Sequence, residues 1–334
     1  MPLLTSAHDV HKACDTLLHA ADSIIAMDCE GEHLGRKGKI SIVQAATAKE
    51  AFVFDVSETK GAVFDHGLRE VLQSPAVVKL FFDCRHDADA LQHLHNIRLS
   101  GVCDLQLLEL MSRDDDEDDQ LRRLHGCLHH GNVRGSPHLY KSVHKLAGLK
   151  DCLEHFELGG GDLKKQIRAK FRADGEYWMQ RPLPPEAMEY AMHDVQSLFD
   201  LLDALAAERH EVPSLAAKDD AITEASARYA DLFRCQGVQA SECYYQHALL
   251  PLCVVEGIPP VCVKGHGPPM TCKNCKQTLP RAAFPKIAQK VPNKCRCDVC
   301  RAIDVDISTR VSWNRVSWNH DSDSDSDSDG PSSD

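Results

Sequence analysis

Short apolar runs alternate with segments of helical period through most of the chain. Runs of apolar residues bounded by turn residues predict strands, which we place at residues 23–28, 39–45, 51–55, 77–82 and 102–104. Apolar residues at helical spacing predict helices, which we place at residues 1–22, 84–96, 141–156, 185–194, 195–210 and 214–235. Because the strands gather early and the helices late, we expect an α/β fold in which helices flank a mixed sheet.

Two stretches interrupt this pattern. Residues 112–137 are acidic and then rich in His and Gly, without an apolar period, which predicts a solvated loop insertion. Beyond about residue 235 the helical period is lost, and Pro, Cys and Gly become frequent. We therefore expect a large domain over residues 1–212, a helical extension and linker over 213–262, a cysteine-rich module over 263–305 and a tail over 306–334.

The formal net charge of −12 comes from two acidic segments and not from the body of the protein. One is the run DDDEDD at residues 114–119, and the other is the Asp-Ser tail that starts at Asp321. Without them the chain holds 38 acidic and 38 basic residues. The acidic tail cannot bury a core, so we expect it to be disordered. Between Lys264 and Arg301, in contrast, nine basic residues stand against a single acid.

The cysteines and the first segment bear on the compartment. Fifteen cysteines accompany a first segment, MPLLTSAHDVHKACD, that lacks a basic stretch followed by an apolar one. We therefore expect no secretory signal and reduced thiols, with metal binding where cysteines cluster. Apolar residues never form the run of about eighteen that a membrane span needs. We expect a cytoplasmic or nuclear protein without a membrane partner.

Paired acidic residues follow the predicted strands. Asp28 and Glu30 end a strand, where alternation turns both side chains to one face. Two carboxylates held together repel one another, and a divalent cation, which prefers oxygen ligands, relieves that repulsion. Two solvated acids at a strand exit explain the same pattern, so this pair alone is not decisive.

Two further pairs are spaced four residues apart, on one face of a predicted helix. The stretch KLFFDCRHDADAL carries Asp83 and Asp87, and the stretch MEYAMHD carries Tyr190 and Asp194. Taken alone, Asp83 fits a helix N-cap and Asp87 fits a surface acid. The three motifs in order are a stronger indication than any one of them.

In this order the motifs resemble the ribonuclease D branch of the DEDD-type 3′-5′ exonucleases, over roughly residues 20–210. IIAMDCE matches the D-x-E motif, KLFFDCRHDADAL matches the second motif, and YAMHD matches Y-x-x-x-D. Asp83 stands where the family often has Asn. Within the branch, DCEGEHLGRKGKISIVQ and FFDCRHDADAL are most similar to Egalitarian-type exonuclease-domain proteins. The resemblance implies a ribonuclease H-like fold.

The resemblance also implies a reaction, the hydrolysis of 3′-terminal phosphodiesters with release of nucleoside 5′-monophosphates. The implied ligands of two Mg²⁺ or Mn²⁺ ions are Asp28, Glu30, Asp87 and Asp194. Asp28 would bridge both ions, Glu30 and Asp194 would hold the ion that carries water, and Asp87 would support the other. Tyr190 would orient the attacking water. An all-oxygen site suits Mg²⁺ or Mn²⁺ better than zinc.

Four residues after the first motif are candidate substrate contacts. Arg36 and Lys37 in the turn GRKGK would contact phosphates of the incoming strand, and an exposed basic hairpin turn explains them equally well. By analogy with the family, His33 and Leu34 would pack against the terminal nucleotide.

The cysteines of the C-terminal module have metal-ligand spacing. Cys272 and Cys275 form one C-x-x-C knuckle and Cys297 and Cys300 form another, as in zinc ribbons and treble clefs. Four thiolates leave no open position on Zn²⁺, so we predict a structural, zinc-ribbon-like module. Cys295 is the alternative to Cys297 as a ligand. The basic charge of the module suits nucleic acid, and also the acidic tail or a protein partner.

Three functions fit these observations. The first is an active exonuclease on single-stranded nucleic acid, with RNA favoured over DNA by analogy with the family. The second is a nucleic-acid-binding adaptor that keeps the fold without catalysis. The third is a scaffold that recruits protein partners through the zinc module and the tail. Because all five residues of the implied active site are present, we expect the first.

Overall fold

The computed structural model describes residues 3–114, 116–125, 127–140, 143–159, 166–167, 169–171, 174–235, 248–251, 254–255 and 268–305. The predicted disordered tail, residues 306–334, lies outside the described residues, as does most of the predicted linker after residue 235. Among the described helices, none is both long and apolar enough to span a membrane.

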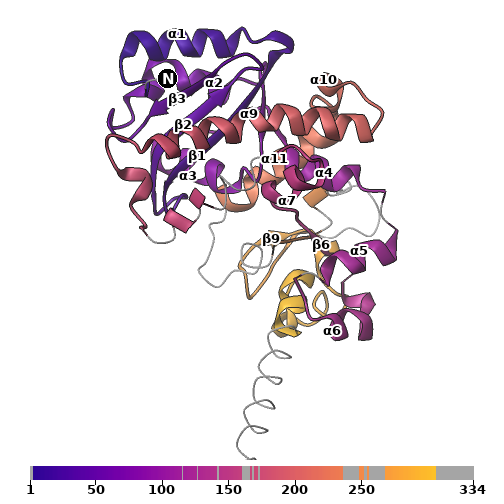
Figure 1. Ribbon diagram of the computed structural model, residues 1–334. Coiled ribbons are helices and arrows are strands. Elements are labelled where there is room, and N and C mark those ends of the chain that lie inside the picture. Colours follow the sequence, from indigo (N-terminus) through magenta and orange to yellow (C-terminus); the bar gives the residue numbers. More distant parts are fainter. Residues whose placement is uncertain are drawn as a thin grey trace, which may run out of the picture.

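A mixed sheet of five strands in the order β3-β2-β1-β4-β5 forms the centre of the larger part of the described chain (Figure 1). The strands are β1 (Ile24–Glu32), β2 (Lys39–Ala46), β3 (Ala51–Asp55), β4 (Val78–Phe81) and β5 (Val102–Asp104). Strands β1, β2 and β3 pair antiparallel, whereas β4 and β5 continue the sheet parallel to β1. The predicted α/β fold with a mixed sheet is confirmed.

Helices cover the sheet on both faces (Figure 1). They are α1 (Ala7–Leu18), α2 (Arg69–Gln73), α3 (Arg85–His95), α4 (Leu105–Ser112), α5 (Glu117–Leu124), α6 (His130–Gly135), α7 (Leu149–His155), α9 (Pro185–Glu208), α10 (Pro213–Ala216) and α11 (Asp220–Arg234). Short helical turns lie at Ala21–Ser23, Phe64–Leu68, Pro137–Leu139, Tyr177–Met179, Arg281–Ala283 and Pro292–Lys294.

The pairing of β1, β2 and β3 sorts their side chains between the two faces of the sheet. Residues that pair directly in antiparallel strands point to the same face. Asp28 pairs with Gln44, and Glu30 pairs with Ile42. Gln44 in turn pairs with Val53. The two acids of the first motif therefore lie on the face that also carries Ile42 and Val53.

Helix α9 covers this face. Ile42 and Val53 form a buried cluster with Trp178 and Tyr190, and the helix packs across β1, β2 and β3. The two helical stretches predicted at 185–194 and 195–210 are this one helix. Its packing brings the third motif over the first, because Tyr190 and Asp194 lie in its N-terminal half.

An ion pair fixes the segment that leads into α9. The Arg181 guanidinium donates to both carboxylate oxygens of Asp55, at 2.7 and 2.6 Å. Asp55, at the end of β3, is 1% exposed, and the Arg181 side chain is 19% exposed. Arg181 also donates to the Ser41 hydroxyl at 3.0 Å. This pair ties the start of α9 to two strands of the sheet.

Two predictions of local structure are wrong. The expected solvated loop at residues 112–137 contains α5 and α6, and the Asp116 carboxylate caps α5 by accepting from the backbone of residues 118 and 119 at 2.9 Å. The helix expected over 141–156 is instead strand β6 (Val143–Lys145) followed by α7. The reason is that β6 pairs antiparallel with β7 (Leu249–Pro251), about a hundred residues later in the chain.

These segments build a second hydrophobic core with the cysteine-rich module. Leu124, Leu128 and Val133 of the insertion are buried in one cluster with Tyr140, strand residue Leu249 and the module's cysteines. The module itself holds the short hairpin β8 (Met270–Thr271) and β9 (Thr278–Leu279) and helical residues 298–305. The few apolar residues of the insertion therefore pack against the cysteine-rich module.

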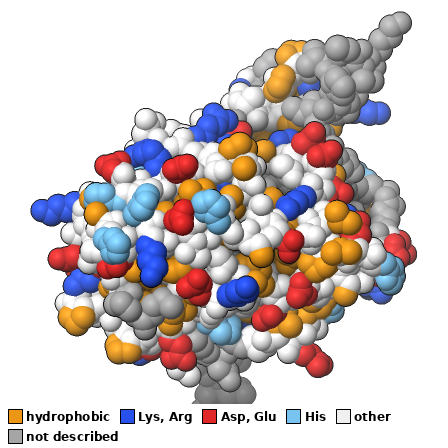
Figure 2. Space-filling model, turned by 90° about the horizontal axis from the view of Figure 1, so that it is seen from above, with side chains coloured by type: hydrophobic (Ala, Val, Ile, Leu, Met, Phe, Trp, Pro, Cys, Tyr) orange, Lys and Arg blue, Asp and Glu red, His pale blue; other side chains and the backbone are white. Residues whose placement is uncertain are grey.

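Charged residues of both signs are interspersed on the face of the molecule that Figure 2 shows. On the face that carries α1, the described Lys, Arg, Asp and Glu side chains alternate with apolar ones (Figure 2). This distribution agrees with the balance of acids and bases outside the two acidic segments.

The buried pair generates a prediction on stability. Replacement of Asp55 by Ala leaves Arg181 without its partner in a mostly buried position, so Asp55→Ala should lower the free energy of unfolding by roughly 3 kcal/mol. Urea unfolding of the full chain measures this. The matched control is Asp65→Ala, which removes an exposed partner of Arg69 and should change stability by less than about 0.5 kcal/mol. Equal effects of the two changes would contradict the role given to Asp55.

Candidate active site

Three carboxylates from the first and third motifs meet in one pocket. One oxygen from each of Asp28, Glu30 and Asp194 lies within 4.8 Å of the others. The pocket has a volume of about 230 Å³. Its lining residues are Asp28, Glu30, Phe82, Asp83, Gln106, Gly148, Leu149, Tyr190, Asp194 and Leu198.

The local structure explains this convergence. Strand alternation aims Asp28 and Glu30 at α9, and one helical turn separates Tyr190 from Asp194. On the neighbouring strand, the Gln44 side-chain amide donates to Asp28 at 2.6 Å. Directly after Glu30 the strand pairing shifts at Gly31, where a Cβ atom would lie 1.9 Å from the Lys39 carbonyl oxygen. Glycine is therefore required at this irregularity.

Tyr190 is a buried phenol beside the acids. Its ring lies 5.9 Å from that of Trp178, centroid to centroid. Burial, and then the carboxylates of Asp194, Glu30 and Asp28, raise the pKa of Tyr190 well above its ordinary value. The hydroxyl consequently keeps its proton and acts as a hydrogen-bond donor toward the pocket.

Asp87 lies at the back of the site. It is 4% exposed, and its carboxylate accepts from the Cys29 backbone N–H at 3.0 Å. Burial raises the pKa of Asp87 to about 7. Its oxygens fall outside the cluster of three carboxylates found among the described residues. Its predicted role at a second ion stays a prediction.

The donor set fits divalent ions of the Mg²⁺ and Mn²⁺ type. Carboxylate oxygens are hard ligands, and three of them from separate positions face one small pocket. Confining three negative charges in this way is unfavourable unless protons or cations neutralise them.

Several residues that line this pocket are absent from the sequence prediction, namely Phe82, Gln106, Gly148, Leu149 and Leu198. The sequence prediction also lacks Gln44, which donates to Asp28. Gln44 carried a usable signal, because it is a polar residue in the apolar run KISIVQA. Gln106 and Leu149 had no such signal, since their place depends on how α4 and α7 pack. Asp83, which the sequence suggested only as the Asn-like position, lines the pocket as well.

The four candidate substrate contacts lie elsewhere. None of His33, Leu34, Arg36 and Lys37 is among the described residues that line this pocket. The Arg36 guanidinium donates to Asp89 at 2.8 and 2.9 Å and to the Phe233 carbonyl at 2.7 Å. It thereby ties the β1–β2 turn to α3 and α11. Contacts of these four residues with substrate stay predictions.

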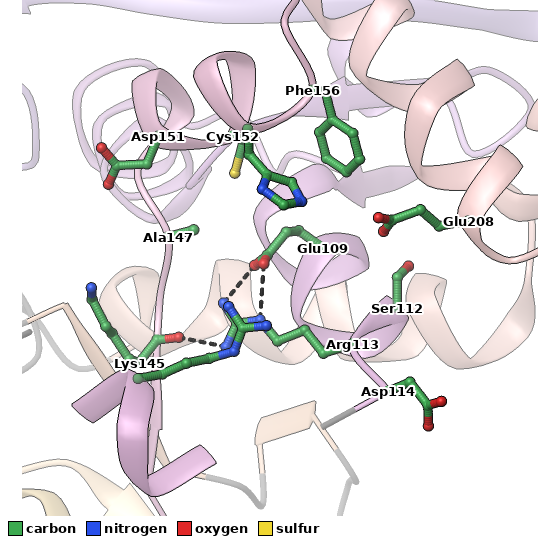
Figure 3. A pocket seen from close by; sticks show the side chains of 12 residues that line it. Glu109, Ser112, Arg113, Asp114, Lys145, Ala147, Asp151, Cys152, Phe156 and Glu208 are labelled. Carbon is green, nitrogen blue, oxygen red and sulfur yellow. Dashed lines mark hydrogen bonds and ion pairs between the residues drawn. The ribbon is translucent and has the colours of Figure 1, made fainter. Parts of the chain in front are cut away.

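A larger pocket, of about 570 Å³, borders the same segment that enters α7, and Ala147, Asp151 and Cys152 line it (Figure 3). Two of its charged groups are paired with one another. Arg113 forms an ion pair with Glu109 at 2.6 Å and donates to the Lys145 carbonyl at 2.9 Å. The acids of the three motifs do not line it. The larger of these two pockets is therefore not the one that holds the candidate catalytic acids.

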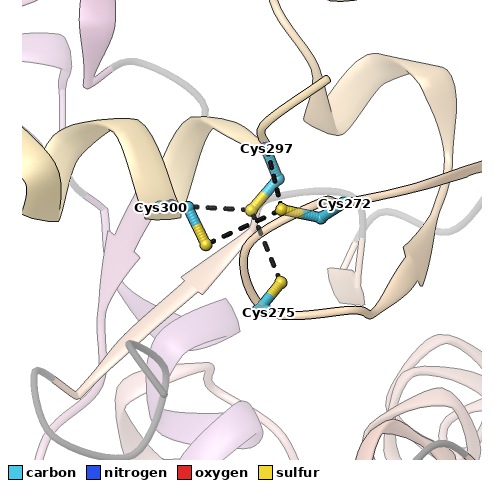
Figure 4. Close-up of side chains that lie close together, drawn as sticks. All are labelled: Cys272, Cys275, Cys297 and Cys300. Carbon is cyan, nitrogen blue, oxygen red and sulfur yellow. Dashed lines mark hydrogen bonds between the residues drawn. The ribbon is translucent and has the colours of Figure 1, made fainter. Parts of the chain in front are cut away.

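The four predicted zinc ligands meet in the second core (Figure 4). All four sulfur atoms lie within 4.8 Å of one another, with Cys272 and Cys300 at 3.8 Å and Cys275 and Cys297 at 3.9 Å. A tetrahedral ion with Zn–S bonds of about 2.3 Å implies sulfur separations of about 3.8 Å. The neighbouring thiols, that of Cys275 first, lower the pKa of Cys272. The arrangement suits a closed, structural zinc site.

Cys295 is the other candidate ligand, and it lies apart from this group. Its sulfur faces the Thr271 carbonyl oxygen at 3.3 Å, and it is not one of the four clustered thiols. The geometry favours Cys297.

Comparison with known proteins matches residues 3–209 to the family described as 3′-5′ exonuclease. Similar curated proteins include the piRNA biogenesis protein EXD1 of Bombyx mori, 32% identical over 101 residues, which are 30% of this chain and 31% of that protein. The protein of the same name from Mus musculus is 25% identical over 167 residues, which are 50% of this chain and 26% of that protein. The matches thus span about a quarter to a third of these relatives.

Solved structures show the same fold. Trypanosoma brucei RNase D in complex with RNA U12 aligns with a TM-score of 0.51 and 21% identity, over 70% of each chain. The GMP complex of the same enzyme aligns with a TM-score of 0.51 and 23% identity, over 70% of this chain and 64% of that one.

The two candidate ligands Cys295 and Cys297 can be separated by experiment. Purified full-length protein, dialysed after expression with zinc, should hold about one Zn²⁺ per chain by elemental analysis. Cys297→Ser should lower this content severely, because serine is a poor zinc ligand, whereas Cys295→Ser should leave it unchanged. Loss of zinc from the second variant and not from the first would reverse the assignment.

Proposed function

The chain belongs to the 3′-5′ exonuclease family, and we propose that it removes nucleotides hydrolytically from the 3′ end of single-stranded RNA. The observation that carries the proposal is the meeting of Asp28, Glu30 and Asp194 with Tyr190 in one pocket. These groups come from motifs more than 150 residues apart in the sequence. Acids that only solvate the surface would not be expected to meet in one pocket.

We assign the acids to a pair of divalent ions. Asp28, Glu30 and Asp194 would hold them directly, and Asp87 would support the second ion. When bound, such ions stabilise charge on the scissile phosphate and lower the pKa of a water molecule. Gln44 fixes one oxygen of Asp28, which limits the directions in which that carboxylate can bind.

Tyr190 acts on the attacking water in this proposal. Its phenol is protonated, since burial and the neighbouring carboxylates raise its pKa. It therefore donates a hydrogen bond and does not accept the proton of the water. Packing against Trp178 restricts the ring to one orientation. Orientation of this kind lowers the entropic part of the barrier.

RNA is the proposed substrate on three grounds of different kinds. The curated relatives are named for piRNA biogenesis, a solved structure of similar fold holds RNA, and the cysteine-rich module is basic. The module would bind the strand outside the pocket, while a closed zinc site would stabilise the module's fold. The second candidate is an adaptor that binds RNA without cleaving it. Retention of all five motif residues favours catalysis.

Removal of one central carboxylate tests the activity. Full-length protein with 5′-labelled single-stranded RNA and Mn²⁺ should shorten the RNA stepwise from its 3′ end, and EDTA should stop the reaction. Asp28→Asn should reduce the rate by roughly a thousandfold, about 4 kcal/mol of lost transition-state stabilisation. Glu189→Gln, an exposed neighbour of Tyr190 on α9, should have no effect. RNA that is bound by the wild type and never shortened would support the adaptor.

Removal of one hydroxyl tests the role of Tyr190. Tyr190→Phe keeps the contact with Trp178 and removes the donor to the water. We expect kcat to fall about ten- to a hundredfold with little change in KM, because the hydroxyl acts on the water and not on the bound strand. Single-turnover rates over a range of enzyme concentrations separate the two constants. A rise in KM at unchanged kcat would instead place Tyr190 in substrate binding.

A further inference from the structure

Asp83 is an acid of the pocket that the proposed mechanism leaves without a role. It follows β4 and precedes α3, with a positive φ of 63°. Its side chain is 28% exposed and lines the pocket together with Asp28 and Asp194. Asp87, four residues later, is almost fully buried and is not among the described lining residues. The second motif therefore presents Asp83 to the pocket.

A single arginine holds this carboxylate in place. Arg85 donates to both oxygens of Asp83, at 2.5 and 2.7 Å. The Arg85 side chain is 3% exposed, and its guanidinium carbon lies 4.7 Å from the ring centre of Tyr229 and 5.0 Å from that of Phe233. Both rings belong to α11. Cation–π contacts of this kind are strong where water is excluded.

Helix α11 also contacts two residues that line the pocket, through the Tyr229 hydroxyl. This hydroxyl lies 3.3 Å from an Asp83 oxygen and donates to the Gln106 side-chain oxygen at 2.5 Å. Burial disfavours the ionised form of Asp83, but the charge and hydrogen bonds of Arg85, together with His86 and the Tyr229 hydroxyl, outweigh burial and keep the pKa of Asp83 below its ordinary value. Asp83 is thus an ionised carboxylate in a fixed orientation.

The chemistry of an ionised carboxylate limits what it can recognise. It offers about four acceptor positions and no donor. Arg85 occupies two of them, and the Tyr229 hydroxyl, whose single proton goes to Gln106, lies 3.3 Å from one oxygen. The exposed part of the group faces the pocket. A phosphodiester has only acceptors, so it cannot bond to the positions that Arg85 leaves open. The donor nearest to a scissile phosphate on RNA is a ribose 2′-hydroxyl. DNA lacks it.

We propose that Asp83 accepts a hydrogen bond from the ribose 2′-hydroxyl of a nucleotide beside the scissile phosphate, and so makes the site prefer RNA to DNA. The inference rests on the proposed function, because that function places the scissile phosphate beside Asp28, Glu30 and Asp194. Arg85 cancels the charge of Asp83, so phosphates are not repelled while the acceptor is kept. Arg85, Tyr229 and Phe233 are positioning residues for this contact.

The test uses three substrates of one sequence and the full-length protein. They are an RNA, the same RNA with 2′-deoxyribose in its last two nucleotides, and the corresponding DNA. The wild type should shorten the RNA about ten- to a hundredfold faster than the other two, the range expected for one hydrogen bond to a charged group. Asp83→Gly should bring the ratio of the rate on RNA to the rate on either deoxyribose substrate close to one. Asp83→Asn, which keeps an acceptor without the charge, should give an intermediate ratio.

Both substitutions suit the backbone, because Gly and Asn tolerate a positive φ. Thermal unfolding tests whether each variant is folded, because Arg85 loses a charged partner in a buried position. Glu189→Gln is the control that should keep the wild-type ratio. Binding of the same three oligonucleotides in EDTA, followed by fluorescence anisotropy, gives the preference without cleavage.

The outcomes separate this inference from the proposed function. Cleavage without preference in the wild type, or an unchanged ratio in Asp83→Gly, overturns the inference and leaves the exonuclease proposal intact. Preferential binding of RNA that depends on Asp83, without any cleavage, supports the inference and overturns the exonuclease proposal. An unchanged ratio with a higher Mn²⁺ requirement in Asp83→Gly would make Asp83 a metal ligand and also overturn the inference.

Discussion

The confinement of three carboxylates is the constraint on which the larger part of this structure depends. With oxygens of Asp28, Glu30 and Asp194 within 4.8 Å of one another, each ionised pair repels by about 3 kcal/mol at an effective dielectric constant near 20. The fold holds the groups together against this force. Strand alternation places Asp28 and Glu30 on one face of β1, and α9 carries Asp194 over that face. The ion pair of Arg181 with Asp55 holds the start of α9 against the sheet. A site that costs stability without cations is well suited to bind them.

The second hydrophobic core is connected to one wall of the pocket through the segment between β6 and α7. The clustered cysteines pack with the apolar residues of the insertion, and β6 of that region pairs with β7. Two residues after β6, Ala147 accepts a hydrogen bond from the Gln106 side chain at 2.7 Å, and Gly148 and Leu149 then line the pocket. The wall of the site is thereby continuous with the cysteine-rich module. A structural metal in that module would stabilise this wall as well as the module itself.

Helix α11 lies beyond the residues matched by the exonuclease family, which end at 209. It nevertheless packs in the main core and carries Tyr229 and Phe233, which hold Arg85. The predicted division between residues 1–212 and the segment that follows stays a prediction about folding units. For the chemistry of the site, however, α11 belongs with the exonuclease region, because Asp83 is oriented through it.

The sequence by itself determined the sheet, the helices at its faces and the acids of the three motifs, because these depend on local periodicity and on side-chain types. It also determined the cysteine knuckles, since ligand spacing is a local property. Only the tertiary structure decided that Gln44 bonds to Asp28, that β6 is a strand and not part of a helix, and that Asp83 lines the pocket whereas Asp87 is not among the described lining residues. Each of these depends on a partner distant in the chain. The shared face of the D-x-E acids on β1 is predictable from strand alternation, whereas the orientation of Asp83 in the pocket depends on a buried arginine and on two aromatic rings of α11.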